Sequence, residues 1–337
     1  MVKPIRLLFF FLVFFPSPAP AISEPDFFNQ YRQNVLPFYH SCEQTFFHSS
    51  EKVKIRYLKH LSTKKETALV ILPGKSESYI KYAELMYDLN APGVSFFVLD
   101  HRGMGFSVRR LADRDKVFVE HFDHYVKDLK NFMDTVVVPQ NFRNLFILGH
   151  SLGGTVALRY LESGAPEMNG VVLCSPMIRI NTRLLPETAA VLITKTMIAL
   201  GRGKKYALTQ GKRKPLRFKN NPLTASKTRW HLWQEKILGQ YPELSSGGAT
   251  NRWVYESLIA GRETLKDRRK IKIPLLVLKA VNDTVVDPEA MDRLCDATRC
   301  EMVSFFKSGH EILMEKDAVR NTALERIKQF MQTHTKK

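Results

Sequence analysis

Short apolar runs alternate with longer amphipathic stretches along most of this 337-residue chain. The short runs are nearly continuous in apolar residues, which is typical of strands buried on both faces of a parallel sheet. The alternation predicts right-handed βαβ units and an α/β fold, with helices on both faces of a mostly parallel sheet. The predicted strands are Val53–Lys59, Ala68–Leu72, Val94–Leu99, Leu145–Leu148, Gly170–Cys174, Leu275–Lys279 and Met302–Phe306. The predicted helices are Tyr79–Leu89, Phe122–Val136, Leu152–Glu162, Pro288–Ala297 and Asp317–Thr333.

This alternation stops between residues 178 and 272. The segment has no convincing strand pattern, but it contains an apolar helix candidate, Thr188–Leu200, and a helical stretch around Trp230 and Trp233. Because it is inserted between two core strands, we expect it to lie over the carboxyl ends of the strands as a helical cap. The predicted organisation is a core of residues 22–177 and 273–337, interrupted by a cap of residues 178–272.

The first 21 residues have the pattern of a secretory signal peptide. A positive segment, Met1–Arg6, precedes the apolar run Leu7–Phe15, and the following residues end in the A-x-A pattern at Ala21. An uncleaved membrane anchor is the first alternative, but nine apolar residues fall short of the roughly 20 that span a bilayer. A buried first helix is the other alternative. We expect residues 1–21 to be removed and the protein to be exported, to the periplasm or outside the cell.

The four cysteines do not indicate a metal site. Cys174 ends an apolar strand, where we expect it to be buried as a small hydrophobic residue. Cys295 and Cys300 are close enough in sequence to form a disulfide, which export would permit, although free thiols are equally compatible with the sequence.

The net charge of +18 is concentrated in the predicted cap. No acidic residue occurs between Gly201 and Arg229. Such a block is either a solvated face or a surface that attracts an anionic substrate or membrane. The chain has no nucleic-acid-binding motif, so a nucleic-acid partner is not expected. The basic residues of the block are Arg202, Lys204, Lys205, Lys212, Arg213, Lys214, Arg217, Lys219, Lys227 and Arg229.

The strongest chemical motif is Gly149-His150-Ser151-Leu152-Gly153. It stands between an apolar strand, Asn144–Leu148, and an amphipathic helix that continues to Leu161. Strand, G-x-S-x-G and helix together are typical of a nucleophile elbow, in which the serine lies on a tight turn at the carboxyl end of the strand. The alternative is a structural glycine turn that happens to contain a serine. We predict that Ser151 is a nucleophile.

A nucleophilic serine needs a base and an acid that orients the base. In α/β-hydrolases these residues follow the serine in the order acid, histidine. Asp283 follows the predicted strand that ends at Lys279, and His310 follows the last predicted strand beside a glycine. Asp287 lies one turn further on and is the alternative acid. His150, inside the elbow, is expected to pack there without acting as the base.

An oxyanion intermediate needs two hydrogen-bond donors. We predict the backbone N–H of Leu152, directly after the nucleophile, and the N–H of Lys75 in the loop after strand Ala68–Leu72. An ordinary glycine turn is the alternative for that loop. Gly103-Met104-Gly105 lacks the third glycine of a dinucleotide loop, and His310-Glu311-Ile312-Leu313-Met314 lacks the second histidine of a zinc-protease helix. Neither a metal nor another cofactor is expected.

Five segments carry a family resemblance: residues 73–85, 100–107, the elbow, 285–287 and 310–317. With these, the chain resembles the bacterial lysophospholipases related to monoacylglycerol lipases, in the α/β-hydrolase superfamily, from about Pro37 to Met331. The resemblance implies a catalytic triad of Ser151, Asp283 and His310. It also implies hydrolysis of the single fatty-acyl ester of a lysophospholipid. Many relatives work without a cleaved signal peptide, attached to the inner face of a membrane, and the chain departs from them there.

The cap is expected to select the substrate. Lys204, Lys205, Arg213 and Arg217 could bind the phosphate of a lysophospholipid, and helix Thr188–Leu200 could line an acyl tunnel or touch a membrane surface. A monoacylglycerol lipase or general carboxylesterase is the nearest alternative, since it would share every catalytic residue. A membrane-surface binding protein without turnover, and an enzyme that transfers the acyl group to another alcohol, are the remaining alternatives.

Overall fold

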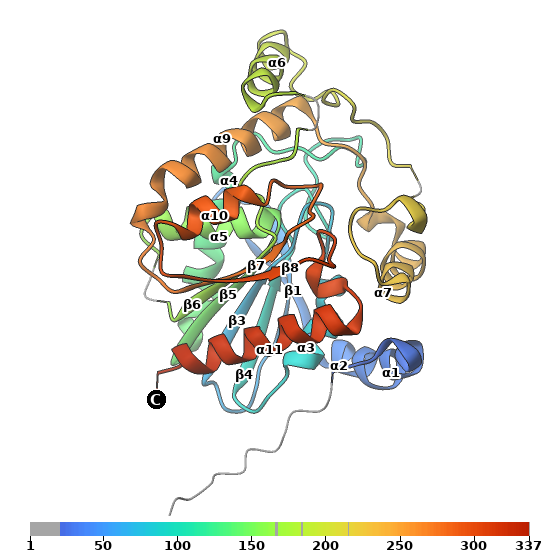
Figure 1. Ribbon diagram of the computed structural model, residues 1–337, viewed down its shortest axis with the longest axis vertical. Helices are drawn as coiled ribbons and strands as arrows, with labels where there is room; N and C mark the ends of the chain where they lie inside the picture. Colours follow the sequence, from blue (N-terminus) through green and yellow to red (C-terminus); the bar gives the residue numbers. More distant parts are fainter. Residues whose placement is uncertain (1–20, 166–167, 183–184, 215, 337) are drawn as a thin grey trace, which may run out of the picture.

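The computed structural model describes residues 21–165, 168–182, 185–214 and 216–336. The predicted signal peptide therefore lies outside the described residues except for Ala21. An eight-stranded sheet with the order β1-β2-β4-β3-β5-β6-β7-β8 forms the centre of the molecule (Figure 1). Strands β3 to β8 are parallel to one another, while β1 and β2 are antiparallel to their neighbours. The strands are β1 Glu43–His48, β2 Lys54–His60, β3 Thr67–Leu72, β4 Val94–Leu99, β5 Asn144–His150, β6 Gly170–Cys174, β7 Leu275–Ala280 and β8 Cys300–Phe305.

The predicted α/β fold is confirmed, and each predicted strand is present within two residues of its expected bounds. The inner strands β3 and β6 are buried at every position, which is why their sequences are continuously apolar. The sequence analysis missed β1, because only one of its residues is buried and most of its other positions carry polar side chains. This strand lies at the edge of the sheet and pairs only with β2.

Helices cover both faces of the sheet. On one face α4, α5 and α10 share a hydrophobic core with the inward side chains of the strands, and on the other face α3 and α11 do the same. The amino-terminal segment, which the sequence analysis left unassigned, is helical and packs on the α3 and α11 face. These helices are α1 Phe27–Gln30, α2 Leu36–Ser41, α3 Ala83–Leu89, α4 Asp123–Phe132, α5 Leu152–Glu162, α10 Glu289–Cys295 and α11 Asp317–His334.

The segment between β6 and β7 contains helices and, among its described residues, no strand of the sheet. Its main helices are α6 Glu187–Ala199, α7 Lys227–His231, α8 Leu238–Gln240 and α9 Asn251–Asp267. Helix α9, which was not predicted, packs on the core helix α5 and carries α6 on its other side, so that α6 forms a tip of the molecule (Figure 1). The segment also contacts loops at the carboxyl ends of strands: Asp287 N–H donates to the Arg179 carbonyl, and His310 N–H donates to the Pro222 carbonyl.

A disulfide joins Cys295 and Cys300, and so connects the end of α10 to the start of β8. Of the two alternatives that the sequence allowed, the structure therefore contains the bridge. Cys174 is a free thiol with no exposed surface, as predicted. Across the described residues, none of the helices combines the length and apolar character that a bilayer crossing requires.

Candidate active site

Ser151 stands between the end of β5 and the first residue of α5, with φ 50° and ψ −114°. A positive φ is unfavourable for a residue with a side chain and is retained where the surroundings enforce it. The flanking glycines explain how the turn fits. A Cβ on Gly149 would lie 2.7 Å from the Gly153 carbonyl oxygen, and one on Gly153 would lie 2.1 Å from the Leu72 carbonyl oxygen. The G-x-S-x-G pattern is thus required by close packing against β3 and α5.

Asp283 and His310 are in direct contact. His310 Nδ1 lies 2.6 Å from Asp283 Oδ2, and both side chains are buried. The other carboxylate oxygen, Oδ1, accepts the backbone N–H groups of Val285 and Val286 at 2.7 and 3.1 Å. An ionised carboxylate can only accept, so this contact makes Nδ1 the protonated nitrogen and leaves Nε2 to accept a proton.

Asp287, the alternative acid, is engaged elsewhere. Its carboxylate pairs with Arg179 at 3.0 Å and accepts the backbone N–H of Glu289 at the start of α10. Of the two acids that the sequence allowed, only Asp283 therefore faces the histidine.

The loop that carries His310 is fixed by the inserted segment. The N–H groups of His310 and Glu311 donate to the carbonyls of Pro222 and Leu223, at 3.2 and 2.8 Å. Gly309 N–H donates to Glu315 Oε1 at 2.8 Å, and the same oxygen accepts Ala225 N–H at 2.9 Å. The position of the histidine thus depends on the inserted segment as well as on the sheet.

The two predicted oxyanion donors lie on the elbow and on the loop after β3. Leu152 is the first residue of α5, so its N–H has no partner within the helix and carries the positive end of the helix dipole. The Lys75 loop is held on both sides: Gly74 N–H donates to Glu77 Oε2 at 2.6 Å, and Ser76 N–H contacts Met104 Sδ at 3.4 Å.

Residues 100–107 form a scaffold for this loop rather than a dinucleotide site. Asp100 accepts hydrogen bonds from Ser78 Oγ, Tyr79 N–H and Phe106 N–H, and burial raises the pKa of its carboxyl to about 7 against these bonds. His101 Nε2 lies 3.0 Å from the Pro73 carbonyl oxygen, and burial lowers the pKa of its imidazole to about 4. The neutral ring therefore donates to the carbonyl and fixes the start of the loop.

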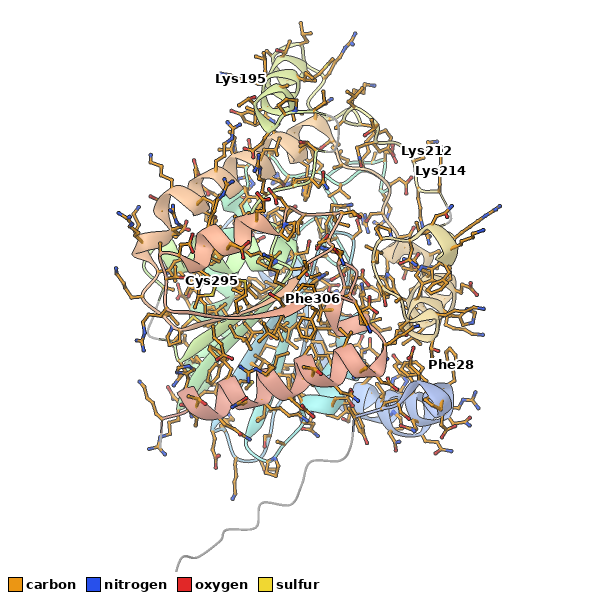
Figure 2. All side chains as sticks on the ribbon, in the orientation of Figure 1. Phe28, Lys195, Lys212, Lys214, Cys295 and Phe306 are labelled. Atoms are coloured by element: carbon orange, nitrogen blue, oxygen red, sulfur yellow. A yellow bond between two sulfur atoms is a disulfide. The ribbon has the colours of Figure 1, made fainter. Side chains whose placement is uncertain are left out.

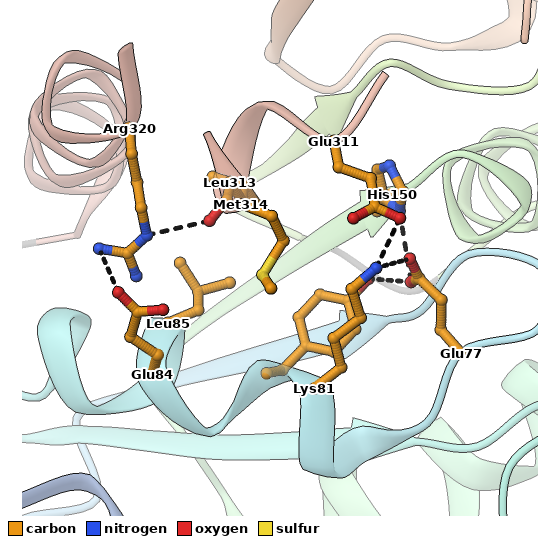
Figure 3. A pocket seen from close by; sticks show the side chains of 10 residues that line it. Glu77, Lys81, Glu84, Leu85, His150, Glu311, Leu313, Met314 and Arg320 are labelled. Carbon is orange, nitrogen blue, oxygen red and sulfur yellow. Dashed lines mark hydrogen bonds and ion pairs between the residues drawn. The ribbon is translucent and has the colours of Figure 1, made fainter. Parts of the chain in front are cut away.

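A buried ionic cluster beside the elbow was not predicted (Figure 3). Lys81 Nζ lies between two carboxylates, 2.6 Å from Glu77 Oε1 and 2.7 Å from Glu311 Oε1. Glu77 Oε2 also accepts the Tyr82 hydroxyl at 2.6 Å and faces His150 Nδ1 at 3.3 Å. These side chains border a cavity of about 20 Å³, enough for about one water molecule.

This cluster connects the Lys75 loop to the base. The ring centre of His150 is 5.0 Å from that of His310, while Glu77 holds the Gly74 amide. Burial lowers the pKa of His150, but Glu77 outweighs this and raises the pKa above its ordinary value. Burial likewise opposes ionisation of Glu77, yet Lys81 and His150 keep its pKa well below the usual range. The i, i+4 spacing of Glu77 and Lys81 was the one signal of this cluster in the sequence.

The four basic residues predicted to bind substrate lie along the stretch of the insertion between α6 and α7. Lys204 lies over the Phe118 ring at 5.9 Å, and the Arg213 N–H donates to Asp115, so both lie against the loop that follows β4. Arg217 instead precedes Phe218, which contacts Trp230 on α7. Lys204, Lys205 and Arg217 are exposed. Their role in binding the phosphate of a substrate therefore stays a prediction.

Known proteins resemble this chain over most of its length. The model of the family described as serine aminopeptidase, S33, matches residues 63–317. Lysophospholipase L2 of Escherichia coli is 33% identical over 309 residues, which cover 89% of this chain and 90% of the relative. A probable lysophospholipase L2 of Haemophilus influenzae is 30% identical, with 92% and 98% covered. A crystal structure of a soluble variant of monoglyceride lipase from Saccharomyces cerevisiae has a TM-score of 0.69 at 20% identity, with 88% and 96% covered. The chain thus belongs to the serine aminopeptidase S33 family, within the α/β-hydrolase superfamily.

Proposed function

We propose that this protein is a lysophospholipase, which hydrolyses the fatty-acyl ester of lysophospholipids through an acyl-enzyme. The observation that carries the proposal is the 2.6 Å contact of His310 with Asp283 in a chain whose elbow presents Ser151 on a strained turn. The resemblance to lysophospholipase L2 proteins of two bacteria, over about nine-tenths of the chain, supports the substrate class.

In the proposed reaction, His310 Nε2 takes the proton of the Ser151 hydroxyl while the serine oxygen attacks the ester carbonyl. The backbone N–H groups of Leu152 and Lys75 stabilise the oxyanion that forms. The intermediate collapses with transfer of the proton from His310 to the leaving glycerol oxygen, which releases a glycerophosphodiester. Water then repeats the sequence on the acyl-enzyme, with His310 again as the base, and releases the fatty acid.

A monoglyceride lipase is the second candidate, because monoglyceride lipases also align with this chain. The mouse enzyme is 22% identical over 82% of the chain, a weaker match than either lysophospholipase. The family is described as serine aminopeptidases, whereas the relatives that align over most of this chain are named lysophospholipase and monoglyceride lipase. The greater identity favours the lysophospholipid, whose phosphate a basic surface would attract.

We also propose that the tip formed by α6 contacts the lipid surface from which the substrate comes. Leu192 of α6 and Leu200, which directly follows the helix, are each 65% exposed, and Leu208 further on is 63% exposed. Among the described residues of α6 only Ala190 and Thr194 are buried, which speaks against its lining an enclosed acyl tunnel. Lys195 lies on α6 at the same tip, and Lys212 and Lys214 extend from the part of the insertion that follows α6 (Figure 2). Exposed leucines beside lysines are suited to an anionic membrane surface.

The test is fatty-acid release from lysophosphatidylethanolamine and from a monoglyceride of the same chain length, by the wild type and by Ser151→Ala. We expect preference for the lysophospholipid and loss of both activities in the variant by at least about 10⁴-fold. Equal rates on both substrates, lost in the variant, would favour the monoglyceride lipase or a general esterase. Full activity in the variant would refute the role of Ser151.

A further inference from the structure

The backbone of Ile22 is held in a buried cluster of charges at the start of the described chain. Ile22 is 1% exposed, and its N–H donates to Asp88 Oδ1 at 3.2 Å. Its carbonyl accepts a hydrogen bond from Arg229 Nη2 at 3.1 Å. Asp88 lies on α3 and Arg229 on α7, so one residue of the amino-terminal segment joins the core to the inserted segment.

Acidic groups outnumber basic groups around this backbone nitrogen. Arg320 Nη1 pairs with Asp88 and with Glu84 at 2.5 and 3.2 Å. Arg229 pairs with Glu84 and with Asp317, both at 3.0 Å. Nearby groups include the Lys328 ammonium, which interacts with Asp88, and Glu24, whose carboxylate accepts the Ser226 hydroxyl. These four carboxylates outnumber the three cations, and Glu325, which also interacts with Lys328, adds a further carboxylate at the edge of the cluster. The groups are Glu24, Glu84, Asp88 and Asp317 against Arg229, Arg320 and Lys328.

Glu84 is the buried acid of the cluster that contacts both arginines. Burial raises the pKa of Glu84, and Asp88 raises it further, so that even two arginines do not bring it to its ordinary value. Figure 3 shows Glu84 and Arg320 lining the same cavity as His150 and Glu311. This acid-rich cluster therefore borders the ionic cluster of the candidate active site.

The A-x-A pattern places the predicted cleavage between Ala21 and Ile22, at this same nitrogen. Hydrolysis of that amide by water gives the Ala21 carboxylate and an Ile22 α-ammonium, replacing one neutral N–H donor with a charged group that has three. We propose that the ammonium made by removal of residues 1–21 forms a buried ion pair with Asp88 and adds a positive charge to this acid-rich cluster. In this proposal the leader is removed before the chain folds, so the buried position of Ile22 does not hinder cleavage.

This ion pair would also stabilise the loop that carries His310. Arg229, which holds the Ile22 carbonyl, donates through Nη1 to the Glu315 carbonyl at 2.8 Å. The Glu315 side chain in turn accepts the N–H groups of Gly309 and Ala225. Removal of the leader is thus a maturation step, after which the new amino terminus ties α3, α7 and the histidine loop together.

The ion pair is tested by comparing chains that begin at Ile22 with chains that carry one extra glycine before Ile22. Both are released from a fusion by a protease that leaves no other residue. We expect the chain that begins at Ile22 to melt about 5 °C higher or more. The difference should vanish in Asp88→Asn and persist in Asp26→Asn, a matched change at an exposed residue of the same segment. Equal melting midpoints of the two wild-type chains, or an equal difference in Asp88→Asn, would overturn the proposal.

A second measurement does not depend on folding of the Asp88 variant. The full chain is expressed in bacterial cells, and the amino terminus of the recovered protein is determined by mass spectrometry. We expect it to be Ile22, with an α-amine that limiting acetic anhydride fails to acetylate in the folded protein and acetylates after denaturation. A different first residue, or acetylation of the folded protein at the rate of exposed lysines, would contradict the ion pair.

Discussion

The region around Ser151 and the tip around α6 are built in opposite ways. Around Ser151, glycines allow backbone contacts that no other residue would permit, and Asp283, His310, Glu77 and His150 are all buried. On α6, most described side chains are exposed or partly exposed, and leucines face solvent. Rigid close packing suits a group of atoms that must react in one geometry, whereas an exposed apolar and basic surface suits an irregular lipid aggregate. We therefore expect changes in the first region to lower kcat and changes in the second to raise KM.

The sharpest test of the first region is to replace each of the two candidate acids separately with asparagine. Asp283→Asn should reduce kcat by about 10⁴-fold, because an amide at that position no longer fixes the tautomer of His310. Asp287→Asn is the matched control. Its carboxylate pairs with Arg179, so kcat should stay within about threefold of the wild type. Steady-state hydrolysis of a lysophospholipid measures both, and equal losses in the two variants would break the distinction between them.

The buried ionic cluster should matter first for stability. Glu77→Gln leaves Lys81 and His150 facing a neutral amide, and breaking such a pair costs about 3–5 kcal/mol of unfolding free energy. An exposed carboxylate serves as control: Glu289→Gln should change stability by less than about 0.5 kcal/mol. Urea denaturation followed by fluorescence measures both. If Glu77→Gln costs no more than the control, the cluster is not structural, and its contact with Gly74 requires another explanation.

The strands of the sheet and the elbow could be predicted because each leaves a local signal. Continuous apolar runs indicate buried strands, and glycines on either side of a serine indicate a turn that tolerates no larger side chain. Strand β1 and helix α9 were missed because few of their apolar positions follow a clear strand or helix period, and because contact with a neighbouring element defines them more than their own composition does. The cluster of Glu77, Lys81, His150 and Glu311 comes from three segments far apart in the chain, so it depends on the assembled fold.

The spread of the basic residues could not be inferred either. A run of charges indicates a surface, but which face each side chain takes depends on the irregular backbone between α6 and α7. There, Lys204 lies over the Phe118 ring, while Arg217 directly precedes Phe218, which contacts Trp230 of α7. The composition predicted a charged insertion, but the position of each charged side chain depends on the folded backbone.

A smaller effect is expected from His150, in the pH dependence of the unfolding free energy. Its pKa in the folded protein lies above the ordinary value of 6.5, because Glu77 outweighs the effect of burial. The folded state therefore binds the proton more tightly, and His150 stabilises the fold fully below pH 6.5. This contribution is lost as the pH rises through the folded-state pKa. In His150→Asn, the unfolding free energy should decline less steeply over that range than in the wild type. His121→Asn, at an exposed histidine, should retain the wild-type slope, and identical slopes in all three proteins would contradict the role of Glu77.

The insertion should give the smallest effects, and they should appear in KM. Exchanging Lys204→Gln, Lys205→Gln, Arg213→Gln and Arg217→Gln together weakens the attraction of a broad face for anionic lipid. We expect KM for a lysophospholipid to rise about three- to tenfold at low salt, with kcat unchanged and KM for a monoglyceride little affected. The matched control, Lys64→Gln, Lys65→Gln, Lys127→Gln and Lys130→Gln, removes the same charge from exposed sites outside the insertion. A similar rise in KM in the control would mean that net charge alone explains the effect.

An equal rise in KM for both substrates would contradict recognition of the phosphate by these residues. A loss of kcat would show that the insertion also affects the geometry of the reacting groups.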